Sequence, residues 1–209
     1  MNFKQTYLRM HFLANNLIKN YILKESDVTF IVETVRDEIF MKEPNILTLK
    51  GPAYVVGAIN GDLNDLLSIF DIGGPPQYST YLFLGNYTGE EGHSLNALLL
   101  LLVYKYLYKD NIFLLQGSNE IQLYTKSVNQ KEKELIPISS HVKVLNFNQE
   151  IINLYELDEA IHIWELFQSV FLIFSKAAII NNTYFCADYN FSLPDPLNLS
   201  IESIRRIER

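Results

Sequence analysis

The chain has 209 residues, which is enough for one domain with a sizeable core, and its 48% hydrophobic and 20% charged residues exclude a disordered chain. The net charge of -7 makes nucleic acid a poor partner, because an acidic surface repels the phosphate backbone. The one cysteine, Cys186, excludes an internal disulfide and fits a reducing compartment, so we expect a cytoplasmic protein.

The first 43 residues have the spacing of helices. Apolar residues recur at intervals that place them on one helical face: Val28, Ile31, Val32, Val35 and Ile39. We expect Ser26 or Asp27 to cap this helix and Pro44 to mark its end.

We expect no secretory signal and no membrane span. Charged residues interrupt the apolar N-terminal segment at Lys4 and Arg9, so it lacks a clean apolar stretch. The longest apolar run, Ala97 to Tyr104, is far shorter than the roughly 20 residues that a membrane span needs.

Three short β-rich runs alternate with helical segments in the first half of the chain. The runs are 53–56, 81–84 and 112–115, and helical spacing fills 62–70 and 95–108, the second with Ser94 as a candidate cap. This alternation is typical of a mainly parallel sheet covered by helices.

Each of the three runs is followed closely by a glycine, at Gly57, Gly85 and Gly117. Ligands of such sheets bind at the carboxyl ends of the strands. We therefore expect the loops 57–62, 85–93 and 117–120 to meet at one site.

The second half begins with a polar segment of mixed charge, about 121–150, which we interpret as a surface insertion. After it, 151–174 has helical spacing, and Ala177–Ile180 and Tyr184–Cys186 form a predicted hairpin. We expect a single domain over 1–209, with a helical part at 1–43 and a core at 44–209.

The segments around the strand ends resemble a known family. The run YLFLGNYTGEEGHSL at 81–95 is similar to YLFLGDYVDRGKQSL of the type 1 and type 2A Ser/Thr phosphoprotein phosphatases. The segments EPNILTLKGPAYVVG, LLLLLVYKYLYKDNIFLLQG and IRRI match the same framework. The resemblance implies an α/β fold: a metallophosphatase-like β-sandwich flanked by helices, here with added N-terminal helices and without the family's second half.

The resemblance also locates the family's metal ligands. The family motif GDxHG corresponds to 57–61, which places Ala58 at an Asp ligand and Asn60 at a His ligand. The motif GDxxDRG places Asn86 at the bridging Asp, Gly89 at the next Asp and Glu90 at the phosphate-binding Arg.

Two further motifs complete this correspondence. GNHE places Ser118 at the Asn ligand and Asn119 at the general-acid His, and retains Glu120; HGG places Asp188 at a His ligand. The family's reaction needs two divalent metals held by anionic and imidazole ligands. We therefore predict no metal, no cofactor and no catalytic residue.

Other interpretations of the polar residues remain open. One alternative is a weak metal site with oxygen ligands, formed by Asp188, Asn60, Asn86 and Asn119. The other is that these four are ordinary polar loop residues. We interpret Asp62, Asp65 and Glu120 as surface or capping groups and Cys186 as a buried, inert thiol. No motif supports a triad of Ser94 or Ser118 with one of the scattered histidines, at 11, 93, 141 and 162.

These residues predict a catalytically inactive pseudophosphatase, not an enzyme, that acts as a protein-binding subunit of a larger complex. Self-association is an alternative form of binding. A residual or repurposed phosphoester hydrolase is the second hypothesis, and a ligand or peptide binder that uses the old cleft is the third. Glu90 and Glu91 oppose an anionic ligand there and favour a basic peptide.

Overall fold

The computed structural model describes residues 2–89, 94–121, 146–189, 191 and 200–207. The elements of the first half are α1 (Phe3–Ile18), α2 (Glu25–Glu38), the 3-10 helix η1 (Phe40–Lys42), β1 (Ile46–Leu49), β2 (Tyr54–Val56), α3 (Leu63–Gly73), β3 (Tyr81–Phe83), α4 (Ser94–Leu107) and β4 (Ile112–Leu114). The second half contains α6 (Asn146–Leu154), α7 (Leu157–Ile173), β5 (Ala177–Ile180), β6 (Tyr184–Cys186) and α8 (Ile201–Arg205).

The described strands form two sheets of three strands each. In the first sheet, in the order β2-β3-β4, all neighbours are parallel, with Tyr54 opposite Tyr81 and Tyr81 opposite Ile112. The second sheet has the order β1-β5-β6: β1 and β5 are parallel, and β5 and β6 form the predicted hairpin. A parallel bridge between Leu115 and Ser175 joins the two sheets.

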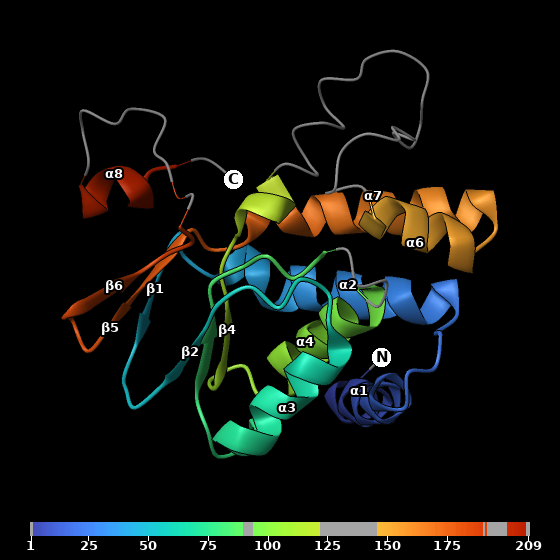
Figure 1. The fold of residues 1–209 in the computed structure, drawn as a ribbon, viewed down its shortest axis with the longest axis horizontal. Helices are drawn as coiled ribbons and strands as arrows, with labels where there is room; N and C mark the ends of the chain where they lie inside the picture. Colours follow the sequence, from blue (N-terminus) through green and yellow to red (C-terminus); the bar gives the residue numbers. More distant parts are fainter. Residues whose placement is uncertain (1, 90–93, 122–145, 190, 192–199, 208–209) are drawn as a thin grey trace, which may run out of the picture.

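The alternation of side chains along the strands separates the layers. Tyr81 and Phe83 belong to the core that β3 shares with the helices, whereas Leu82, between them, packs with Leu47 and Ala178 of the second sheet. Helices therefore cover one face of β2-β3-β4, and β1-β5-β6 covers the other face (Figure 1). The expected β-sandwich with flanking helices is confirmed.

The N-terminal helices belong to the main core. α1 and α2 both pack on α4, and α2 also packs on α7. Helix α4 is apolar on nearly every side and is buried along most of its length, because it lies between the sheet and these helices. No described helix is long and apolar enough to cross a membrane.

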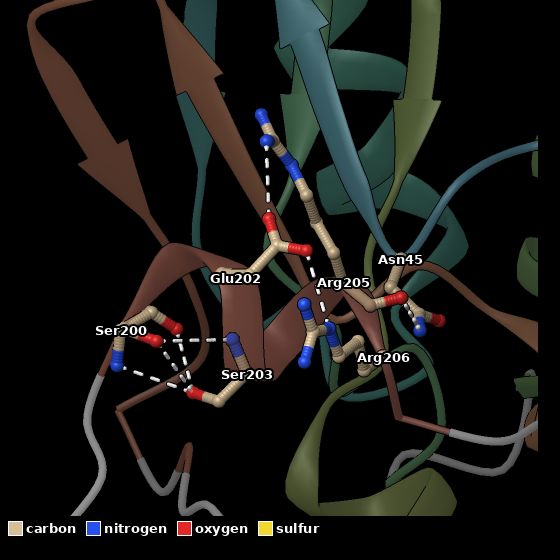
Figure 2. Close-up of polar contacts among 6 residues, drawn as sticks. All are labelled: Asn45, Ser200, Glu202, Ser203, Arg205 and Arg206. Carbon is tan, nitrogen blue, oxygen red and sulfur yellow. Dashed lines mark hydrogen bonds and ion pairs between the residues drawn. The ribbon is translucent and has the colours of Figure 1, made fainter.

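Helix α8 covers the outer face of the second sheet. Ile204 packs against Ile46 and Ala177 of β1 and β5. The amide nitrogen of Asn45, just before β1, donates hydrogen bonds to the carbonyl oxygens of Arg205 and Ile207 at 3.2 and 2.6 Å. Figure 2 shows the contact between Asn45 and Arg205, together with the Ser200–Ser203 capping box that starts the helix.

Two details of the sequence analysis differ from the structure. The prediction that Ser26 or Asp27 caps α2 was wrong. The helix starts at Glu25, with Lys24 at the N-cap position, and no side chain caps it. The strand β1 was not predicted. The expected insertion at 121–150 falls mostly on 122–145, which lie outside the described residues.

Candidate functional site

The carboxyl ends of β2, β3 and β4 bring together the three loops that the sequence singled out. The backbone N–H of Asn60 donates to the carbonyl oxygen of Asn86 at 3.0 Å, which joins the first loop to the second. The backbone N–H of Asn119 donates to the Asn86 side-chain oxygen at 2.9 Å, which joins the third. Parallel pairing of the strands produces this convergence (Figure 1).

The centre of the site is a hydrogen-bonded network between Asn86 and Asp188. The Asn86 Nδ2 donates to Asp188 Oδ1 at 2.9 Å, and the Asn86 Oδ1 accepts from the Ser118 hydroxyl at 3.0 Å. The second oxygen of Asp188 accepts from the backbone N–H of Ser118 at 3.1 Å. Asn86, Ser118 and Asp188 are all buried, so these polar groups satisfy one another away from water.

Asn119 has a structural role beside this network. Its Nδ2 donates to the carbonyl oxygen of Thr88 at 2.7 Å, and this contact ties the third loop to the second. An amide has no pKa near neutrality, so a side chain in this position does not exchange a proton with a substrate. The position that the resemblance assigns to a general acid therefore holds a loop contact.

Glu120 braces the turn after β3. Its carboxylate accepts hydrogen bonds from the backbone N–H groups of Asn86, Tyr87 and Gly117 at 2.9 to 3.0 Å, and its side chain is fully buried. The expectation of a surface group was wrong, because Glu120 is buried, but its carboxylate does cap backbone N–H groups. Burial raises the pKa of Glu120, although these N–H groups act in the opposite direction.

The first two loops lie in close contact at Gly89. A Cβ added at Gly89 would lie 2.0 Å from the carbonyl oxygen of Asn60, and the Gly89 N–H donates to the Ser94 hydroxyl at 3.1 Å. Asn60 and Asn86 both have positive φ, a conformation that Asn tolerates better than most residues. Ala58 lies in the first loop and has a methyl side chain, which provides no donor atom for a metal.

The remaining candidate residues lie apart from this network or outside the described residues. Asp62 caps α3 as expected, through the N–H groups of Asn64 and Asp65. Cys186 is half-buried on β6, and burial raises the pKa of its thiol. His162 of α7 pairs with Glu25 of α2 at 2.5 Å. Glu90, Glu91, His93 and His141 are outside the described residues.

The side chains present do not fit a two-metal centre. Divalent metals of this kind need several anionic or imidazole ligands, and among the described ligand positions only Asp188 is ionisable. Both oxygens of Asp188 and the amide of Asn86 already form internal hydrogen bonds. Within the described residues, no three His, Cys, Asp or Glu side chains are grouped as metal ligands would be.

The sequence did not identify Glu150 as a residue that caps the start of α4, next to the second loop of the site. Its carboxylate accepts from the N–H groups of Ser94 and Leu95 at 3.0 and 3.1 Å, at the start of α4. A carboxylate is stabilising at this end of a helix, where N–H groups lack intrahelical partners. Glu150 comes from α6, and no local motif could have paired it with Ser94.

Comparison with solved structures defines the class of fold. A serine/threonine phosphatase from Saccharomyces cerevisiae, described as similar to human phosphatase PP5, superposes with a TM-score of 0.70 at 24% sequence identity. The match covers 91% of this chain and 55% of the phosphatase, so the chain spans little more than half of that protein's length. The fold is therefore that of a Ser/Thr phosphatase-like metallophosphoesterase.

The family assignment follows from the sequence of the core. Residues 51–209 match the Metallophos family of calcineurin-like phosphoesterases. This range includes both sheets except β1 and contains every residue of the Asn86–Asp188 network. The chain belongs to the calcineurin-like phosphoesterase family, as the resemblance of its strand-end segments predicted.

Proposed function

We propose that this member of the family does not hydrolyse phosphoesters and that it acts by binding another protein. The proposal has two parts, which are tested separately. The first part is the loss of phosphoester hydrolysis at the strand ends, and the second part is the binding of another protein by the surface of the fold. A cytoplasmic location and a place in a larger complex belong to the same proposal.

The hydrogen bond between Asn86 and Asp188 is the observation that carries the first part. An Asp and a His at these positions would be oriented by a metal ion, whereas an amide and a carboxylate are complementary without one. The bond is 2.9 Å long and buried, so it replaces ligand-to-metal contacts with a direct contact between side chains. The network supports a site that is complete without a metal.

The well-formed core supports the second part. Phe83, Tyr87 and Leu114 around the site are fully buried, and the Tyr87 hydroxyl donates to the carbonyl oxygen of Leu115 at 2.7 Å. Burial raises the pKa of Tyr87 well above its ordinary value, so its phenol stays neutral and holds the strand ends. A well-packed fold whose ligand positions have changed is suited to recognition by its surface.

Membership of a phosphoesterase family favours the alternative, a residual or repurposed hydrolase. Such an enzyme would need an ionisable group at the strand ends, and Asp188 is the one candidate among the described ligand positions. Asp188→Asn removes its charge at nearly constant shape, which makes this variant the natural discriminator between the two functions.

The experiment is hydrolysis of p-nitrophenyl phosphate by the full chain, with and without added Mn²⁺. The Asp188→Asn variant tests the site, and Asp71→Asn, at an exposed position on α3, is the matched control. We expect the unmodified chain to show no more turnover than either variant. Mn²⁺-dependent turnover that Asp188→Asn abolishes and Asp71→Asn retains would establish the hydrolase instead.

A further inference from the structure

The charge of the chain is divided unevenly along the sequence. Residues 1–24 contain Lys4, Arg9, Lys19 and Lys24 and no Asp or Glu, whereas the chain as a whole carries -7. The first 24 residues therefore carry +4 and the rest of the chain carries -11. This basic segment contains α1, whose residues 3–18 include Lys4 and Arg9 and no Asp or Glu.

Helix α1 is apolar on two sides. On its inner side Met10, Leu13 and Leu17 are fully buried, in the core formed with α4. On its outer side Leu8 and Phe12, one helical turn apart, are 58% and 63% exposed. A surface helix needs only one apolar side to join its own core, so the exposed pair is left for another contact.

Aromatic residues lie along a different side of α1, where Phe3 and Tyr7 line a pocket with Ile39 and Tyr106. Phe3 is 74% exposed, and the rings of Phe3, Tyr7 and His11 contact one another at one-turn spacing, with centroid separations of 6.1 and 4.6 Å. Tyr21 and Ile22, directly after the helix, are 59% and 49% exposed. Figure 1 shows α1 at the periphery of the fold, beneath α4. We call Leu8 and Phe12 the outer face of α1.

The basic side chains of residues 1–24 differ in whether they already form contacts within the fold. Arg9 forms an ion pair with Asp27 at 2.5 Å and lies over the ring of Phe30, so its charge is used within the fold. Lys4, Lys19 and Lys24 are exposed, and they form no ion pair with the described residues. Lys4 is one helical turn before Leu8, and Lys19 follows the last turn of α1. An apolar face with these lysines calls for a partner with both apolar and acidic groups.

We infer that the outer face of α1 is a docking surface for an acidic amphipathic helix of another protein. This inference rests on the proposed function, because it identifies the surface and the chemistry of the bound partner. Apolar side chains of such a helix would cover Leu8 and Phe12, and its carboxylates would face Lys4 and Lys19. Pairing of α1 with α1 of a second copy would bring two basic segments together, so charge disfavours that dimer.

The test uses two synthetic helical peptides of about 20 residues, each labelled with fluorescein. Both have the same Leu and Ala positions on one side, with Glu on the polar side of one and Lys on that of the other. Binding to the full chain is measured by fluorescence anisotropy. The variants are Leu8→Ser/Phe12→Ser and Lys4→Glu/Lys19→Glu, with Ile72→Ser as the control, since Ile72 is 85% exposed on α3.

We expect the Glu peptide to bind about tenfold or more tightly than the Lys peptide. We expect Leu8→Ser/Phe12→Ser and Lys4→Glu/Lys19→Glu each to weaken its binding about tenfold or more, while Ile72→Ser has no effect. Equal binding of the two peptides, no binding up to about 1 mM, or equal loss in the Ile72→Ser control would overturn the proposal.

Sedimentation with vesicles of phosphatidylserine and phosphatidylcholine tests the alternative that α1 binds a membrane surface. An interfacial basic helix would bind anionic lipid, so sedimentation with these vesicles without binding of the Glu peptide would overturn the proposal in favour of a membrane surface. Hydrolysis of p-nitrophenyl phosphate is measured on the same preparations. Failure of peptide binding without hydrolysis rejects only the docking surface, whereas Mn²⁺-dependent hydrolysis rejects the proposed function.

Discussion

The side-chain nitrogen of Asn86 donates a hydrogen bond of 2.9 Å to a carboxylate oxygen of Asp188, 102 residues further along the chain. The resemblance places a bridging Asp at the first position and a His ligand at the second. An Asp and a His here would both be oriented by a metal ion. The present pair is complementary by itself, so the two positions work as one unit.

The substitution Asn86→Asp tests this complementarity. It removes the donor and places a second carboxylate against Asp188, so we expect a loss of about 3 kcal/mol in the free energy of unfolding at pH 7. Repulsion raises the pKa of the pair above its unfolded value. The penalty should therefore grow as the pH rises from about 4 and shrink on acidification.

Urea unfolding at pH 7 and near pH 4 measures the effect of Asn86→Asp, with Asn64→Asp at an exposed position of α3 as the control. An equal penalty at both pH values would show that the two carboxylates do not interact.

The close contact between the first two loops gives a second prediction. Gly89→Ala should destabilise the fold by about 1 to 3 kcal/mol, because the new Cβ would meet the Asn60 carbonyl oxygen at 2.0 Å. Gly57→Ala is the matched control, since a Cβ there has no neighbour within 4 Å. Thermal unfolding of the two variants compares them directly, and equal melting temperatures would contradict the loop contact.

The predictable part of the site depended on local patterns. Continuous apolar runs identified β3 and β4, and the parallel arrangement then brought Gly85 and Gly117 to the same edge. The resemblance assigned Asn86, Ser118 and Asp188 to neighbouring ligand positions, and the structure brings these three side chains into contact. The hydrogen bonds that join them could not be read from spacing.

The unpredicted parts depend on contacts between distant segments. Strand β1 pairs with β5, with Ile46 opposite Ala177. Its four residues are too few to show a period, so the run did not lead to a strand prediction. The helix predicted over 95–108 contains Lys105, whose side chain is fully buried. Its Nζ pairs with Glu43 at 2.5 Å and donates to the carbonyl oxygen of Ile112, and tertiary packing alone places these groups together.

This buried pair gives a third prediction. Burial lowers the pKa of Lys105, while the charge of Glu43 acts in the opposite direction. Lys105→Met should cost about 3 to 5 kcal/mol of stability, because it leaves the Glu43 carboxylate without its cation. The double variant Lys105→Met/Glu43→Leu should recover most of that loss. Chemical denaturation of the single and double variants tests this, and strictly additive losses would contradict the pairing.

Glu120 gives a prediction about pH. Its folded-state pKa is raised, so the folded protein binds its proton more tightly than the unfolded chain does. The contribution of Glu120 to the free energy of unfolding is complete below its unfolded pKa of about 4.3. This contribution declines as the pH rises through the raised pKa of the folded state. The stability difference between the unmodified chain and Glu120→Gln should therefore be larger near pH 4 than at pH 7.

Urea titrations of both proteins across this range measure that difference. A difference that increases with pH would mean that the three N–H groups outweigh burial and that Glu120 is an ordinary low-pKa carboxylate.

The most direct test of the central claim is the metal content of the purified chain after incubation with Mn²⁺, Fe²⁺ or Zn²⁺ and removal of free metal, measured by inductively coupled plasma mass spectrometry. We predict far less than one metal ion per chain, and the same value for Asp188→Asn. Near-stoichiometric metal in the unmodified chain that Asp188→Asn removes would contradict the account, because it would show that the Asn86–Asp188 site still assembles a metal centre.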